Sequence, residues 1–263
     1  MPYAKVNDLD IYYELHGPEG AEPLFLFNGA FGVIGANSDW SFQLPRLAQQ
    51  YRVIAFEHRG HGRTNNPAQG FSGYDVLAAD AVGLLRYLNV SRAAMVGFSD
   101  GAITLLELAQ RYPEMIENLV LIGANYYNDE SCLKAMETLR PEYIEQHFPA
   151  WSDNLEQQHG SQGMGYWKEL AAQLSEMWLE KPNYSKDDLG RIAVPTLVMT
   201  GQHDNFGSLA QTLDIHRAIK GSELCIVPGA SHPVLSQRPE ITTMLILDYL
   251  DRQRKRRKKL AKA

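Results

Sequence analysis

Short apolar runs recur along the chain, and most are followed by turn residues and then a helix-like segment. The runs occupy residues 24–27, 53–56, 93–96, 119–122, 196–199 and 224–227. Continuous apolar strands of this length suit a parallel sheet that is buried on both faces. Segments with apolar residues at helical spacing occupy residues 75–88, 99–111 and 236–250. The alternation predicts an α/β fold with a mostly parallel, doubly wound sheet.

One long segment interrupts this alternation. Residues 125–190 contain no strand-like run and are too long for a plain connection between two strands. We interpret them as a helical cap over the carboxyl edge of the sheet, inserted into a core made of residues 1–124 and 191–251. The aromatic residues of the cap can line an apolar pocket or form the cap's own core, and the second use is the commoner one. They are Tyr126, Tyr127, Tyr143, Trp151, Trp167 and Trp178.

Charge is unevenly distributed along the chain. The formal net charge is −6, yet residues 252–263 are dominated by Lys and Arg, so the remainder is strongly acidic. An acidic body argues against a nucleic-acid-binding fold. We interpret residues 252–263 as a basic tail that extends the last helix, frays and stays solvated.

The cysteines and the N-terminal sequence bear on the compartment. Cys132 and Cys225 lie far apart without ligand-like spacing, which favours two thiols in a reducing compartment. The chain opens into strand-like sequence without a basic and apolar leader, and no apolar run is long enough to span a bilayer. We therefore expect a cytoplasmic protein that acts on a small-molecule substrate.

A candidate nucleophile lies between an apolar run and a helix-like segment. Residues 97–101 read Gly-Phe-Ser-Asp-Gly, which fits the pattern G-x-S-x-G around Ser99. The pattern alone is weak, but its position after a strand and before a helix suits a sharp turn that lifts the serine hydroxyl above the sheet edge. The alternative is an ordinary turn that happens to contain a serine. Because a serine is a poor nucleophile at neutral pH, it needs a base nearby.

The base and its carboxylate partner are expected after the last two strands. His232 follows the run at 224–227, and Asp204 follows the run at 196–199. An imidazole base needs a carboxylate that fixes its tautomer and stabilises its cation, and Asp204 is the candidate. His203 is a weaker candidate for the base, because it lies beside the acid rather than beyond the last strand.

Backbone amides must stabilise the negative charge that develops during acyl transfer. The amide of Asp100, at the start of the helix after Ser99, is one expected donor. The other should come from the loop at residues 28–32, with Ala30 the first choice and Phe31 the second. Glycines in this loop permit a close approach to substrate.

These residues carry a family resemblance. The whole chain resembles the α/β-hydrolases that have a helical cap, whose nucleophile, acid and base occur in the order found here for Ser99, Asp204 and His232. Asn28-Gly29 resembles the family's oxyanion His-Gly pair, with Asn in place of His. Residues 57–64 resemble its Asp-x-Arg-Gly-x-Gly-x-Ser turn, with Glu and Thr in the outer places.

A narrower resemblance concerns the first half of the chain. Gly-x-Ser-Asp-Gly followed by Ile103-Thr104, and residues 123–125 followed by tyrosines, are similar to the valacyclovir hydrolase group. That resemblance implies hydrolysis of α-amino-acid esters, with the side chain of Asp100 binding the substrate ammonium. The expected substrate-binding residues are Asp100, Asn28, Phe98, Tyr126 and Trp167.

Other functions share some of these features. Carbon–carbon bond hydrolases, lactonases and perhydrolases use the same three residue types, and a small-molecule receptor can be built on a hydrolase scaffold. A metal-dependent enzyme would use Glu57, His58 and His61, but their spacing fits no standard zinc motif. No phosphate-binding or dinucleotide-binding glycine loop occurs, so neither a metal nor an organic cofactor is expected.

Overall fold

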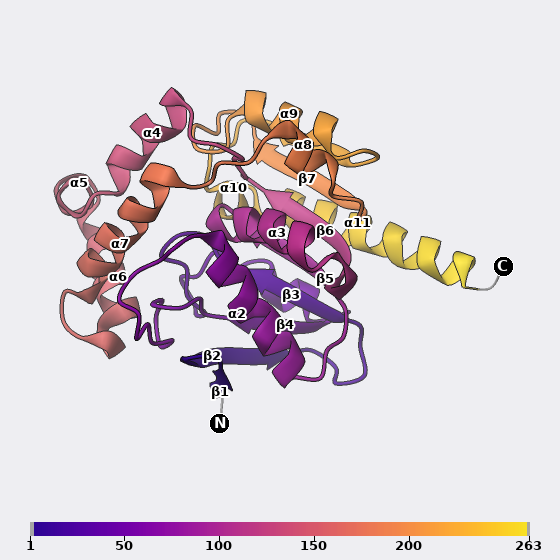
Figure 1. Ribbon diagram of the computed structural model, residues 1–263, viewed down its shortest axis with the longest axis horizontal. Coiled ribbons are helices and arrows are strands. Elements are labelled where there is room, and N and C mark those ends of the chain that lie inside the picture. The colour runs from indigo at the N-terminus through magenta and orange to yellow at the C-terminus, as the bar shows by residue number, and fades with distance from the viewer. Residues whose placement is uncertain (1–2, 262–263) are drawn as a thin grey trace.

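A computed structural model of the chain describes residues 3–261; the first two residues of the expected core and the last two of the expected tail lie outside the described residues. Its strands form one sheet in the order β1-β2-β4-β3-β5-β6-β7-β8. Figure 1 shows the sheet with helices around it. β1 and β2 pair antiparallel, and the strands from β4 to β8 in that order pair parallel. The expected mostly parallel α/β fold is therefore confirmed. The strands are β1 (Tyr3–Val6), β2 (Leu9–His16), β3 (Pro23–Phe27), β4 (Arg52–Phe56), β5 (Ala93–Phe98), β6 (Ile116–Ile122), β7 (Thr196–Gly201) and β8 (Glu223–Val227).

Helices connect the strands and cover both faces of the sheet. The segment expected to form one helix at 236–250 is divided in two, because Pro239 begins a new helix. The helices are α1 (Leu44–Leu47), α2 (Tyr74–Tyr87), α3 (Asp100–Arg111), α4 (Glu130–Met136), α5 (Pro141–His147), α6 (Pro149–His159), α7 (Tyr166–Glu180), α8 (Lys186–Gly190), α9 (Leu209–Ala218), α10 (Val234–Gln237) and α11 (Pro239–Leu260).

The central strands have apolar side chains on both faces, as a doubly covered sheet requires. On β3, Phe25 and Phe27 pack with residues of α2 and α3, whereas Leu24 and Leu26 pack with residues of α1 and α11 on the other face. The same alternation, with a period of two, holds on β4, β5 and β6. This burial fixes the register of each strand and so fixes the loops at the carboxyl edge, where the candidate residues lie.

The segment between β6 and β7 contains helices α4 to α8, joined by short connections. Helices α4 to α7 gather at one end of the molecule, on the left of Figure 1. Their apolar residues form a third cluster with residues from the body, among them Phe31, Tyr74 and Ile103. We call residues 125–190 the helical insert.

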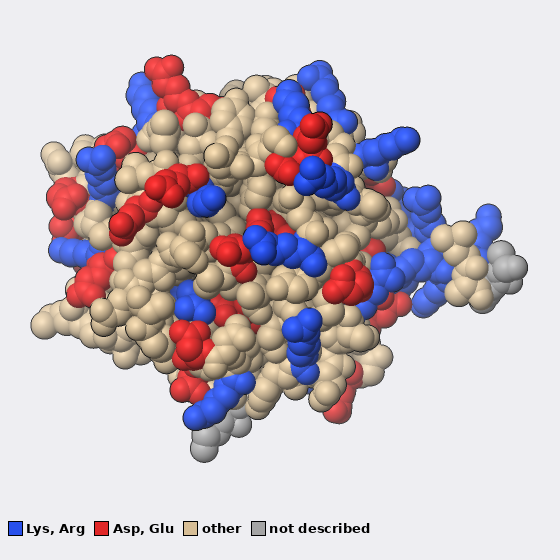
Figure 2. Space-filling view, viewed as in Figure 1, with Lys and Arg blue, Asp and Glu red and all other residues tan. Residues whose placement is uncertain are grey.

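The basic tail differs from the expectation. Residues 252–260 belong to α11, and the first half of the tail packs against the body instead of standing free. Arg252 makes hydrogen bonds of 2.7 and 2.8 Å to the Glu223 carboxylate, Gln253 is 8% exposed, and Arg257 pairs with Glu22 at 3.0 Å. Beyond Arg257 the helix projects from the body, and Lys and Arg side chains gather there on the right of Figure 2.

Within residues 3–261, none of the helices has the length and apolar character that crossing a membrane requires.

Candidate active site

Ser99 lies in the tight turn between β5 and α3. Its backbone angles, φ 52° and ψ −123°, are sterically unfavourable for a residue with a side chain. The turn also brings backbone segments into close contact. A Cβ atom at Gly97 would lie 2.6 Å from the carbonyl oxygen of Gly101, and one at Gly101 would lie 2.5 Å from that of Asn28. The two glycines of the pattern are therefore steric requirements of a turn that presents the Ser99 hydroxyl.

His232 joins Ser99 to Asp204. The Ser99 Oγ lies 2.9 Å from His232 Nε2, and both carboxylate oxygens of Asp204 lie 2.9 Å from His232 Nδ1. Ser99 follows β5, Asp204 follows β7 and His232 follows β8, so the fold brings together residues that are 28 and 133 positions apart.

Asp204 is held so that it accepts the Nδ1 proton. Its Oδ1 accepts hydrogen bonds of 2.9 Å from the amides of Phe206 and Gly207, and its Oδ2 accepts one of 3.1 Å from the Thr200 hydroxyl. A carboxylate surrounded by donors can only accept from His232, so Nδ1 carries the proton and Nε2 presents a lone pair to Ser99. This tautomer is the one that a general base requires.

The expected oxyanion donors also lie at the site. Ala30, Phe31 and Asp100 line the same cavity as Ser99. The hydrogen bonds of residues 3–261 assign no protein acceptor to the amides of these three residues. Free amides beside a nucleophile are available to a developing oxyanion.

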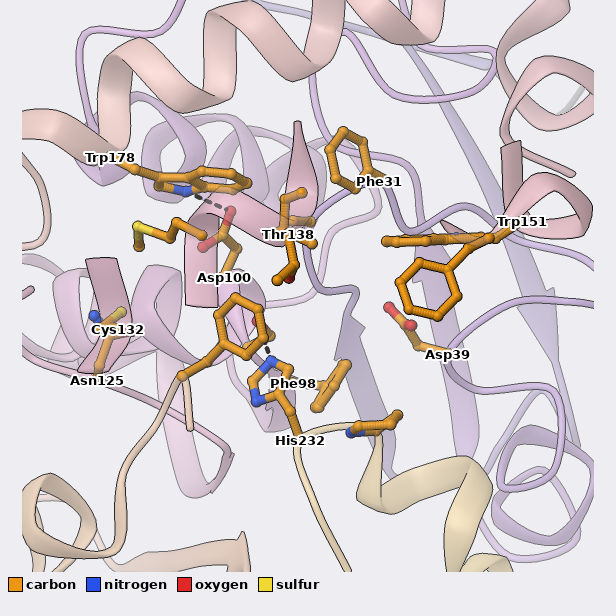
Figure 3. Close-up of a pocket in the computed structure, with 17 residues that line it drawn as sticks. Phe31, Asp39, Phe98, Asp100, Asn125, Cys132, Thr138, Trp151, Trp178 and His232 are labelled. Atoms are coloured by element: carbon orange, nitrogen blue, oxygen red, sulfur yellow. Dashed lines mark hydrogen bonds between the residues drawn. The ribbon is translucent and has the colours of Figure 1, made fainter. Parts of the chain in front are cut away.

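A cavity of about 460 Å³ lies above Ser99, between the body and the helical insert, and Figure 3 shows its walls. Its wall is mostly apolar. The insert contributes residues of α4, α6 and α7 and of the segments that adjoin them, and the body contributes residues at or after the ends of β3, β5, β7 and β8. The lining residues are Ala30, Phe31, Asp39, Phe98, Ser99, Asp100, Asn125, Cys132, Met136, Thr138, Leu139, Phe148, Trp151, Trp178, Phe206, His232 and Pro233.

Comparison with known proteins identifies the family. The family model described as alpha/beta hydrolase fold matches residues 22–155, about half of the chain. The chain belongs to the alpha/beta hydrolase fold family. Human serine hydrolase BPHL is 28% identical to this hydrolase over 258 residues, which cover 93% of this chain and 84% of the relative. This likeness confirms the narrower resemblance.

Two further proteins illustrate the range of relatives. A putative carbamate hydrolase, RutD from Agrobacterium fabrum, is 24% identical over 258 residues, covering 91% of this chain and 98% of the relative. The crystal structure of the enol-lactonase from Burkholderia xenovorans superimposes with a TM-score of 0.80 and 25% identity, covering 95% of this chain and all of that one. The relatives therefore include hydrolases that are named for different substrates.

Asp100 is a carboxylate in a mostly apolar wall of this hydrolase's cavity. Its Oδ1 accepts a hydrogen bond of 2.8 Å from the Tyr74 hydroxyl, and its Oδ2 accepts one of 3.1 Å from the Trp178 indole. Burial raises the pKa of Asp100 to about 6, although the bonds from Tyr74 and Trp178 act in the opposite direction. The two donors fix the carboxylate without neutralising it.

Asp39 is a second carboxylate of the cavity, and sequence reasoning missed it. Its Oδ2 accepts a 2.8 Å hydrogen bond from the Gly29 amide, and burial raises its pKa to about 6. It lies on the Trp151 side of the cavity, whereas Asp100 lies on the Trp178 side (Figure 3). No sequence motif marks Asp39, because its position depends on how the loop after β3 folds back.

Three expected substrate-binding residues lie elsewhere. Asn28 is buried and donates to the Phe56 carbonyl at 3.0 Å, which fastens the loop to β4. The Tyr126 hydroxyl donates to Asp214 at 3.2 Å. Trp167 is 1% exposed in the cluster that joins the insert to the body. Of the expected set, Asp100 and Phe98 line the cavity, and so do three other aromatic residues of the insert, Phe148, Trp151 and Trp178.

The remaining alternative residues have other contacts. His203 is exposed beside Asp204 and contacts the body through its backbone. Glu57 is buried and pairs with Arg63. His58 stacks edge-on against Phe56, with a ring-centroid distance of 4.6 Å. Among residues 3–261, no three His, Cys, Asp or Glu side chains converge as metal ligands would.

Proposed function

We propose that this hydrolase cleaves small carboxylic esters, with Ser99 as nucleophile, His232 as general base and Asp204 as the carboxylate that orients it. The observation that carries the proposal is the hydrogen-bonded series from the Ser99 Oγ through His232 to the Asp204 carboxylate. The relationship to serine hydrolase BPHL also supports a serine nucleophile.

The reaction follows from this arrangement. The Ser99 Oγ attacks the ester carbonyl carbon while His232 Nε2 takes the hydroxyl proton, and the Asp204 carboxylate stabilises the imidazolium. The amides of Asp100 and Ala30, or of Phe31, donate to the carbonyl oxygen as it becomes negative. His232 then protonates the departing alcohol, which leaves an acyl group on Ser99. A water molecule activated by His232 releases the acid by the same steps in reverse order.

The cavity supports a substrate that carries an ammonium group. Its only ionisable neighbours among the described lining residues are the acids Asp39 and Asp100, with Cys132 and His232, and no Lys or Arg. A negative charge beside an oxyanion site opposes the reaction unless it has another use. We propose that Asp100 pairs with the ammonium of an α-amino-acid ester, because it adjoins Ser99 and faces the cavity.

We further propose that the helical insert, residues 125–190, acts as a cap domain over the core, and that the protein functions in the cytoplasm. The contribution of Trp151 and Trp178 to the cavity wall supports the first of these proposals.

A hydrolysis screen with purified protein tests the proposed function. Wild type and Ser99→Ala are compared on four classes of substrate. They are p-nitrophenyl esters of valine and phenylalanine, uncharged acyl esters, lactones and vinylogous diketones. We expect turnover of esters, best with a free amine, and loss of at least about 10³-fold in kcat in Ser99→Ala. Turnover of lactones or diketones in place of esters would show that the protein is a lactonase or a carbon–carbon bond hydrolase instead. Binding without turnover of any class would favour a receptor.

A further inference from the structure

His159 ends helix α6 of the insert and is completely buried. It does not line the cavity, yet it contacts the loop that does. Its Nδ1 lies 2.9 Å from the amide nitrogen of Gly62, and its Nε2 lies 3.2 Å from the carbonyl oxygen of Phe31. The imidazole therefore links three chain segments: the insert, the turn after β4 and the loop after β3.

The two partners determine the protonation of His159. The Gly62 amide can only donate, so Nδ1 must be unprotonated, and the Phe31 carbonyl can only accept, so Nε2 must carry the proton. A second proton would place an N–H group against the N–H of Gly62. Burial lowers the pKa of His159 to about 4, which agrees with a neutral ring. The His61 ring lies edge-on to that of His159, with a centroid distance of 6.1 Å, and burial lowers the pKa of His61 to about 3, so this neighbour is neutral as well.

Phe31 needs support from outside its own loop. Its φ of 62° is a left-handed conformation that an aromatic residue rarely adopts, at a cost of about 1–3 kcal/mol. Strained conformations of this kind persist only when the surrounding structure fixes them. Within the loop, the Gly32 amide donates to the Gly29 carbonyl at 3.0 Å, and Asp39 accepts from the Gly29 amide. The bond from His159 holds the carbonyl side of the peptide group that follows Phe31, whose amide side, at Gly32, is the one bonded within the loop.

We propose that His159 is a positioning residue of the oxyanion site, and that its hydrogen bond to the Phe31 carbonyl keeps the amides of Ala30 and Phe31 directed toward Ser99. The proposal rests on the proposed acyl-transfer function. It makes the helical insert a part of the reaction machinery, because a residue 128 positions along the chain from Phe31 fixes the loop that stabilises the oxyanion.

Two substitutions separate the two bonds of His159. In His159→Asn, the amide oxygen takes the place of Nδ1 and retains the Gly62 bond, but nothing reaches Phe31. In His159→Gln, the longer amide places an N–H group where Nε2 was and retains the Phe31 bond, but the acceptor for Gly62 is lost. Each variant loses one buried hydrogen bond, so the two should lose similar stability.

The kinetic outcomes should differ. On an uncharged p-nitrophenyl ester, we expect His159→Asn to lower kcat about 10- to 100-fold with little change in KM, since removing an oxyanion donor outright costs about 10²–10³. His159→Gln should keep kcat within about threefold of wild type. A trifluoromethyl ketone inhibitor, whose hemiketal oxyanion reports the donors without turnover, should bind more weakly to the Asn variant in the same proportion.

Circular dichroism and thermal unfolding establish that each variant is folded at the assay temperature. Equal losses of kcat in the two folded variants, or a normal kcat in His159→Asn, would overturn the proposal. If the Asn variant does not fold, the Gln variant decides alone, and a fall of more than tenfold in its kcat counts against the proposal. Failure of the proposed function itself would be seen separately, as wild-type protein that does not hydrolyse the ester.

Discussion

The indole of Trp178, near the end of helix α7 of the insert, donates a 3.1 Å hydrogen bond to the carboxylate of Asp100, the residue that directly follows Ser99. The Tyr74 hydroxyl holds the other carboxylate oxygen at 2.8 Å. Both donors are neutral, so the charge of Asp100 has no cationic partner among the described residues. This relationship suggests experiments that examine the charge and its support separately.

Asp100→Asn should remove the preference for a free amine. The amide can turn its oxygen to Trp178 and its nitrogen to the Tyr74 oxygen, so the substitution removes charge and retains both contacts. We expect kcat/KM for an α-amino-acid ester to fall about 10- to 100-fold relative to its N-acetylated form, since a hydrogen bond to a charged group contributes about 1.5–3 kcal/mol. Asp39→Asn is the matched control, because it removes the other cavity carboxylate. If both variants keep the wild-type preference, Asp100 acts only at the helix terminus.

The same preference should depend on pH. A carboxylate binds an ammonium only when ionised, and the pKa of Asp100 is raised to about 6 by burial. The ratio of kcat/KM for the free amine to that for the N-acetyl ester should therefore rise as the pH increases through about 6. Below that pH the preference for the free amine should disappear. Trp178→Phe keeps an aromatic ring but removes a donor that lowers this pKa, so the midpoint should move to higher pH. The measurement is the pH profile of the ratio, which cancels effects on His232 that the two esters share. An unmoved midpoint in Trp178→Phe would contradict this account.

Backbone strain at Ser99 predicts an effect on stability. Its φ of 52° and ψ of −123° suit glycine better than any residue with a Cβ atom. Ser99→Gly should therefore be more stable than Ser99→Ala by about 1 kcal/mol, which corresponds to about 2–4 °C in Tm. Both variants lack the nucleophile, so thermal unfolding compares them without a difference in function. Equal Tm values would mean that the turn relaxes around alanine.

The packed part of the basic tail should matter for stability and not for catalysis. Truncation after Asp251 removes the ion pairs that Arg252 makes with Glu223 and Arg257 makes with Glu22. It also exposes the surface that Gln253 covers. We expect a lower Tm with kcat/KM on small esters unchanged, because these contacts lie away from the cavity. Truncation after Arg257 spares these contacts and removes the projecting end of α11, so it should leave Tm near wild type. A large loss of activity in either truncation would connect the tail to the site.

Residue patterns predicted the fold because its main requirement is local. A strand buried on both faces must be a continuous apolar run, so the runs at 24–27 and 119–122 coincide with β3 and the end of β6. The turn around Ser99 was recognisable because its steric demands select glycine at 97 and 101. Contacts between segments that are distant in the chain have no such local pattern in the sequence. The identity of an aromatic residue does not reveal which neighbour it faces, so the sequence does not distinguish Trp167 and Tyr126, which lie outside the cavity, from Trp178, which lines it. Asp39 also carries no sequence signal. A run of basic residues likewise does not reveal acceptors such as Glu22.

The loop positions described above also have a consequence for synthesis of the chain. The ribosome completes the turn that holds Ser99 long before it makes β7 and β8, which carry Asp204 and His232 to the same edge of the sheet. On the proposed mechanism, the hydroxyl stays unactivated until the last two strands have joined the sheet. A nascent or C-terminally broken chain is then harmless to cellular esters, and the appearance of activity during refolding reports the docking of β8.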